Sequence, residues 1–183
     1  MDEELTIINS NTRSEKIKNL VINNKKKLIV GFSIILVVII GYLSIKEIKE
    51  QNKIKLANQF NITKINFKID DKQTTIDQLI ELIKKNDSTY SPLALYFLID
   101  NNLIDNQKKI NSLFDELINN TSLDHEIKNL IIYKKALFNS DFATESDLLQ
   151  ILNPIINSES IWRSHALYLM AEYFYSKDQK QKS

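Results

Sequence analysis

Two histidines, His125 and His165, are the only imidazoles in this 183-residue chain, which contains no cysteine. A zinc site on a helix needs a second ligand one turn away from the first. Neither histidine has a histidine or a carboxylate at the third or fourth following position, and Glu126 is expected on another face of the helix from His125. Without cysteine there are no disulfides and no thiol catalysis. The sequence therefore predicts no metal site and an ordinary surface or satisfied role for each histidine.

Glycine-dependent and nucleic-acid chemistry are excluded by composition. Only Gly31 and Gly41 are present, both in one apolar segment, whereas phosphate-binding loops and nucleophile elbows need glycines at fixed positions. The formal net charge is +1, and no basic stripe with interleaved aromatics appears. We predict a protein that is not an enzyme, has no cofactor and binds no nucleic acid.

Residues 28–45 read LIVGFSIILVVIIGYLSI and contain no charge. At about 1.5 Å per residue a helix of this length reaches roughly 27 Å, enough for the hydrocarbon core of a bilayer. A buried core helix is one alternative. A cleaved signal peptide is another, but its apolar region would be shorter and would end in a small-residue cleavage site. We predict an uncleaved transmembrane signal anchor.

Cations flank the anchor on both sides, with Lys25, Lys26 and Lys27 against its first turn and Lys46 after its last. Lysine and arginine near a span favour the cytoplasmic side, and long domains translocate largely regardless of charge. We therefore expect residues 1–27 to form a cytoplasmic head and residues 46–183 to lie on the far side of the membrane.

The remainder of the chain shows amphipathic helices with a repeating apolar pattern. Apolar residues spaced as on one face of a helix occur in 75–85 and again 34 residues later in 107–119, with a third copy shifted by a further 38. Helices with wider apolar faces lie between the copies, at 92–101, 123–138 and 160–175. These helical hairpins have the period of tetratricopeptide (TPR) repeats.

We predict an all-α fold in which the membrane helix is followed by a TPR-like α-solenoid of about three and a half hairpins. Leu79, Leu113 and Leu152 are expected to be buried between helices, whereas Met170 and Phe174 are expected to leave apolar surface. The TPR consensus W-x₂-L-G-x₂-Y is absent from every copy. An ordinary helical bundle is the alternative.

The whole arrangement resembles one bacterial family. An acidic head, Asp2 to Leu5, a lysine-rich boundary, one span and divergent TPR hairpins resemble the ancillary SecYEG translocon subunit family, and Ser160 to Leu167 (SIWRSHAL) is similar to its segment in which a Trp-Arg pair opens the last helices. The resemblance implies a single-pass inner-membrane protein with a periplasmic domain, associated with the secretion channel and periplasmic chaperones. A missing last helix is the main departure.

Candidate partner-binding residues are aromatics, which we place on the first helices of the hairpins because first helices line the concave surface of such arrays. Packing between hairpins is the alternative for each, and Arg163 could bind a carboxylate or be solvated. The candidates are Tyr96, Tyr133, Trp162, Arg163 and Tyr168.

The predicted function is that of a membrane-tethered interaction module at the Sec protein-export machinery, binding translocon subunits, periplasmic chaperones or exported chains. An assembly or scaffold factor for another inner-membrane complex is the alternative.

Overall fold

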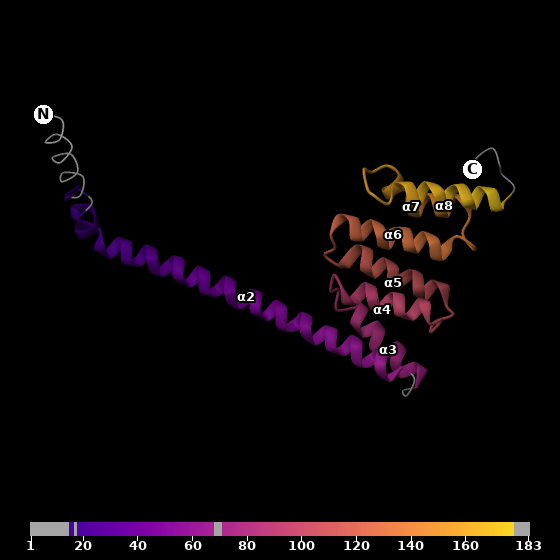
Figure 1. Ribbon diagram of the computed structural model, residues 1–183, viewed down its shortest axis with the longest axis horizontal. Helices are drawn as coiled ribbons and strands as arrows, with labels where there is room; N and C mark the ends of the chain where they lie inside the picture. Colours follow the sequence, from indigo (N-terminus) through magenta and orange to yellow (C-terminus); the bar gives the residue numbers. More distant parts are fainter. Residues whose placement is uncertain (1–14, 17, 68–70, 178–183) are drawn as a thin grey trace, which may run out of the picture. The chain divides into compact units, whose positions relative to one another are not determined.

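The computed structural model describes residues 15–16, 18–67 and 71–177, which form helices and no strand (Figure 1). The predicted all-α class is confirmed. Most of the predicted cytoplasmic head, residues 1–14, lies outside the described residues. The helices are α2 (Lys25–Asn66), α3 (Lys72–Ile83), α4 (Tyr90–Asp100), α5 (Gln107–Asn120), α6 (His125–Asn139), α7 (Glu145–Ile156) and α8 (Arg163–Ser176).

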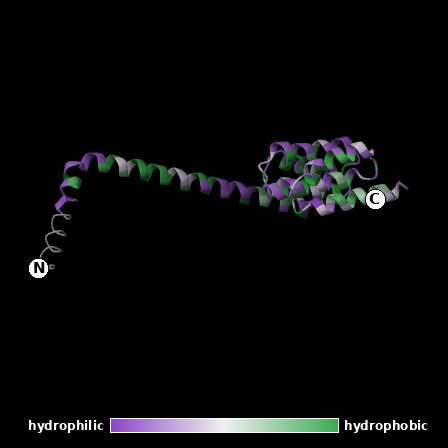
Figure 2. Ribbon diagram, turned by 90° about the horizontal axis from the view of Figure 1, so that it is seen from above, coloured by the Kyte–Doolittle hydropathy of each residue, from purple (hydrophilic) through white to green (hydrophobic). Residues whose placement is uncertain are grey.

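The first of two compact units, Met1–Asn52, contains the apolar part of α2. Every residue from Lys25 to Lys55 is exposed, and none of the most apolar 18-residue window is buried. Figure 2 shows the hydrophobic turns of α2 followed by hydrophilic ones. This segment is therefore not a buried core helix. By its length and composition, α2 can cross a membrane.

The second unit, Lys53–Ser183, is a set of helical hairpins. Each helix from α3 to α8 packs against its neighbour in sequence, and α3 also contacts α5, as α6 contacts α8 (Figure 1). Every consecutive pair from α3 to α8 has a short connection and packs as antiparallel neighbours. We describe the helices as three hairpins, α3–α4, α5–α6 and α7–α8, and from here on call α3, α5 and α7 the first helices.

The three hairpins share one register. Both the first and the second helices begin 35 residues later in the second hairpin than in the first, and 38 residues later again in the third. Fully or nearly fully buried positions of the first helices follow the same shifts: Thr75, Ile110 and Leu148; Leu79, Phe114 and Leu152; and Leu82, Leu117 and Ile155. The predicted shift of 38 is confirmed, but the shift of 34 is one residue short.

The error of one residue comes from Thr75. This polar residue occupies the core position that isoleucine or leucine fills in the other two hairpins, so an alignment of apolar residues alone slides past it. Leu79, Leu113 and Leu152 are buried as predicted, being at most 3% exposed. With the shift of 35, Leu113 corresponds to Gln78 of the first hairpin and not to Leu79.

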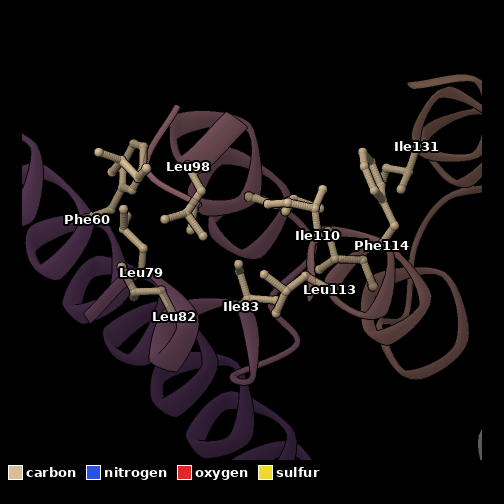
Figure 3. Packing of buried hydrophobic residues seen from close by; sticks show 13 residues of the cluster. Phe60, Leu79, Leu82, Ile83, Leu98, Ile110, Leu113, Phe114 and Ile131 are labelled. Carbon is tan, nitrogen blue, oxygen red and sulfur yellow. The ribbon is translucent and has the colours of Figure 1, made fainter. Parts of the chain in front are cut away.

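The core is formed by two clusters, one centred on α3 to α5 and the other on α6 to α8. Figure 3 shows the first, in which Phe60 from the end of α2 faces side chains of the hairpins. The Phe60 ring lies 6.2 Å from that of Tyr90 and 6.3 Å from that of Phe97, centroid to centroid. Thr63 donates a hydrogen bond to Gln78 at 3.0 Å. The last turns of α2 therefore belong to the second unit.

Asparagine makes the sharp turns that glycine would otherwise make. Asn86 after α3 and Asn102 after α4 have φ of 53° and 48°, a left-handed conformation that asparagine tolerates better than most residues. The Asn86 side chain also donates to Glu116 and accepts from Thr121, both at 3.1 Å. The first turn is thereby bonded to the second hairpin.

The prediction that Met170 and Phe174 leave exposed apolar surface on α8 was wrong. Met170 and Phe174 are only 4% and 9% exposed, because they pack in the second core cluster. Exposed large apolar side chains at this end of the domain include Ile161, Leu167, Tyr168 and Tyr175.

Candidate interaction surface

The five predicted binding residues lie in or at the start of α4, α6 and α8, the wider-faced helices that the sequence predicted as the first helices of the hairpins. Tyr96 is in α4, Tyr133 in α6, and Arg163 and Tyr168 in α8, with Trp162 at the N-cap of α8. In α5 and α7 the large apolar side chains are mostly used in one narrow buried stripe, whereas α4, α6 and α8 carry wider apolar faces whose edges remain accessible.

Three of the rings between α6 and α8 form one cluster. Tyr133 and Trp162 stack with centroids 5.9 Å apart and an interplanar angle of 22°. His165 lies 5.3 Å from Trp162 and 6.0 Å from Tyr133 and is itself exposed. The cluster joins the second hairpin to the third and leaves ring edges accessible from outside.

Tyr96 of the first hairpin contacts the neighbouring part of α6. The ammonium group of Lys134, which follows Tyr133 in α6, sits 4.5 Å from the centroid of the Tyr96 ring, a cation–π contact. The Tyr96 hydroxyl is buried without a hydrogen-bond partner among the described residues, and burial raises the pKa of this phenol far above its usual value. We call Tyr96, Lys134, Tyr133, Trp162 and His165 the aromatic strip.

Exposed apolar and cationic side chains accompany the aromatic strip. Ile127 and Leu137 of α6 are 42% and 49% exposed, and Ile161, in the connection just before α8, is 71% exposed. Arg163 is exposed and has no ion pair within the described part of the chain. Aromatic residues and arginine are enriched where protein interfaces gain most of their binding energy.

Tyr168 does not join the aromatic strip. Its ring is 64% exposed, and the Glu172 carboxylate on the next turn raises the pKa of its phenol through a hydrogen bond and through its charge. Of the five candidates, the structure brings Tyr133 and Trp162 into contact and places Tyr96 against Lys134, the residue that follows Tyr133.

Glu126 holds the segment that carries Trp162. Its carboxylate accepts from the Ser160 hydroxyl at 2.7 Å and from the Ile161 backbone N–H at 3.3 Å, and the Ser160 oxygen in turn accepts from the Trp162 N–H at 3.2 Å. The bond from Ser160, followed by those from His125 and Ile161, lowers the pKa of Glu126. Glu126 is a positioning residue that sequence reasoning missed, because nothing in the local pattern marks a contact 34 residues away.

The expectation that Glu126 lies away from His125 was wrong. The Nδ1 atom of His125 is 3.1 Å from the Glu126 carboxylate, because adjacent long side chains at the start of a helix can bend towards each other. Within residues 15–16, 18–67 and 71–177 no three histidine or carboxylate side chains are grouped so that they could hold a metal ion.

Comparison with protein-family models, with curated proteins and with solved structures finds no match to this sequence or its fold.

Proposed function

We propose that the protein is a membrane-tethered interaction module of the Sec protein-export machinery. In this proposal α2 anchors the chain in the inner membrane with its N-terminus in the cytoplasm, and the hairpins form a periplasmic TPR-like α-solenoid. Translocon subunits, periplasmic chaperones or exported chains are the partners. Function consists of binding, without catalysis.

One observation carries the proposal: the chain combines a helix whose apolar turns are wholly exposed with a hairpin domain that displays the aromatic strip. An apolar helix of this kind is stable in a bilayer rather than in water. Confinement near a membrane complex raises the effective concentration of the domain for partners there. A tethered domain can therefore bind its partner with an affinity that would be too weak for a free domain at the same cellular concentration.

The repeat character is supported by register and packing. Equal shifts for first and second helices, and contacts between every pair of consecutive helices, are typical of helical-repeat arrays. The placement of the domain at the secretion channel rests on the resemblance of SIWRSHAL and of the anchor-plus-hairpin arrangement to the ancillary translocon subunits.

Site-specific photo-crosslinking in cells tests the proposal. A photoreactive amino acid replaces Ile161, beside the aromatic strip, and a matched control replaces Thr74, which is exposed on α3. We expect position 161 to capture a translocon subunit, a chaperone or an exported chain, and position 74 to capture much less. Capture of subunits of a respiratory or division complex alone would contradict the assignment to protein export and favour the assembly-factor function.

A second arm tests the tether. Replacement of residues 1–45 by a cleavable secretory signal peptide lets the domain still reach the periplasm. It should leave partner binding by the purified domain intact but reduce crosslinking in cells severalfold, because confinement is lost. Undiminished crosslinking from the untethered chain would refute a role for the anchor.

A further inference from the structure

A polar groove lies between two first helices, away from the aromatic strip. Its walls come from the first turns of α5 and α7, and its floor from the end of α6 and the α6–α7 connection. The groove is open and has a volume of about 540 Å³. Side-chain carboxamides dominate it, and we call the residues Gln107, Asn111, Asn139 and Gln150 the carboxamide groove.

The floor of the groove is rigid. The amide nitrogen of Asn111 donates to the oxygen of Asn139 at 2.9 Å, and the reverse bond is 2.8 Å. Each nitrogen also donates to a backbone carbonyl of its own helix, that of Gln107 for Asn111 and that of Lys135 for Asn139. Both hydrogens of each amide are thus used, while each oxygen keeps a free lone pair. The floor therefore offers acceptors in fixed positions.

The walls add groups of both kinds. Neither Gln107 nor Gln150 has a side-chain hydrogen bond to any residue that the structure describes, so each can donate and accept. A polypeptide main chain presents one N–H donor and one carbonyl acceptor per residue and needs this combination. The groove is therefore complementary to an extended main chain.

The two charged side chains at the groove already have partners within the chain. Lys135 is bonded to Asp115 at 2.7 Å, with its side chain only 17% exposed. Asp147 forms the capping box at the start of α7 with Thr144. Because Asp115 neutralises Lys135 while the Asp147 carboxylate keeps its charge, the groove favours an uncharged ligand over a free carboxylate or a phosphate.

Apolar side chains at the groove supply a contact for one side chain of the ligand. Phe142, in the α6–α7 connection, is 63% exposed, and Ile151 lies half-buried on the α7 wall. Binding is favoured when an apolar side chain of the ligand lies against the exposed Phe142 ring, because both apolar surfaces are then removed from water.

We propose that the carboxamide groove binds an extended, uncharged segment of another polypeptide through its main chain, with Phe142 contacting one apolar side chain. This inference goes beyond the proposed function, because it concerns a second site on the first helices and holds whichever complex surrounds the protein.

The test measures binding of a defined peptide to the full chain in detergent micelles. The probe is an acetylated and amidated decapeptide of Thr, Val and Gln with one Phe, labelled with an uncharged fluorophore and followed by anisotropy. A second probe has the same side chains but N-methylated main-chain amides. We expect the N-methylated peptide to bind at least about tenfold more weakly, because each lost hydrogen bond weakens binding severalfold.

Variants locate the site. Gln107→Met with Gln150→Met keeps side-chain size and removes the carboxamides, and we expect about tenfold weaker binding; Phe142→Ala should weaken binding severalfold. Gln73→Met on α3 is the matched control and should bind normally, as should Trp162→Phe in the aromatic strip.

Equal affinity for both peptides would overturn the proposal without any variant. So would normal binding by the folded double variant, or loss of binding in Trp162→Phe, which would assign the peptide to the aromatic strip. If the probe does not bind and the chain instead self-associates through the groove, the occupant is a second copy of the chain. That outcome would also refute the proposal.

Discussion

Thr75 is a polar residue at a core position, and replacing it tests the assigned packing. Its side chain is 0% exposed, and its hydroxyl has no hydrogen-bond partner among the described residues. Ile110 and Leu148 fill the same position in the other two hairpins. Thr75→Val keeps the shape and replaces the hydroxyl by a methyl group, so we expect the domain to become more stable.

The magnitude follows from two terms. A buried hydroxyl without a partner costs about 1–3 kcal/mol, and the added apolar group contributes up to about 0.8 kcal/mol. Since local adjustment reduces both terms, the free energy of unfolding should rise by roughly 1–2 kcal/mol. For a domain of this size that corresponds to a melting temperature higher by about 3–8 °C.

Thr121→Val is the matched control. Thr121 is also buried, at 7% exposure, but its hydroxyl donates to the Asn86 side chain at 3.1 Å. Its substitution leaves the Asn86 oxygen without this donor, and the free energy of unfolding should fall by about 0.5–1.5 kcal/mol. The same chemical change is thus expected to act in opposite directions at the two threonines.

Thermal unfolding of the full chain in detergent micelles, followed by fluorescence of the single tryptophan, measures both effects. Trp162 packs against Tyr133 between the second and third hairpins, so its emission reports on the hairpin domain rather than on α2. A melting temperature of Thr75→Val equal to or below that of the wild type would show that the hydroxyl has a partner and refute the argument.

Three further predictions concern the core, a carboxylate and the membrane topology. Leu113→Ala should lower the free energy of unfolding by about 2–5 kcal/mol, whereas Leu137→Ala, at a side chain 49% exposed, should cost far less; equal losses in thermal melts would contradict the assigned core. Glu126→Gln should destabilise the chain at neutral pH. Because the folded-state pKa of Glu126 lies below 4.5, its stabilisation is present above that pH and is lost as the pH falls further, so the melting difference from wild type should shrink in acid; a difference that grows in acid would be inconsistent with this sign. Protease added to spheroplasts should digest residues 46–183 and spare the N-terminal residues, and protection of the hairpins would reverse the proposed topology.

Local pattern was sufficient for much of the fold. The apolar segment 28–45 and the periodic stripes of α3, α5 and α7 are properties of neighbouring residues, so helix type and the burial of Leu79, Leu113 and Leu152 were predictable. Length and hydropathy alone identify α2 as long and apolar enough to span a membrane, since no contact with the rest of the chain is involved.

Contacts across about 30 residues were decided only by tertiary packing. A helix's apolar stripe fixes its buried face to within about one residue, so the choice between shifts of 34 and 35 depended on how Thr75 packs. Tertiary packing likewise brings Glu126 to Ser160, Lys134 over Tyr96, and Asn111 against Asn139. Each is a pair of polar or aromatic groups on different helices, and such groups carry no periodic signal. The aromatic residues can be identified from the sequence. Which of them lie on the same face depends on the angle and register at which one hairpin packs on the next.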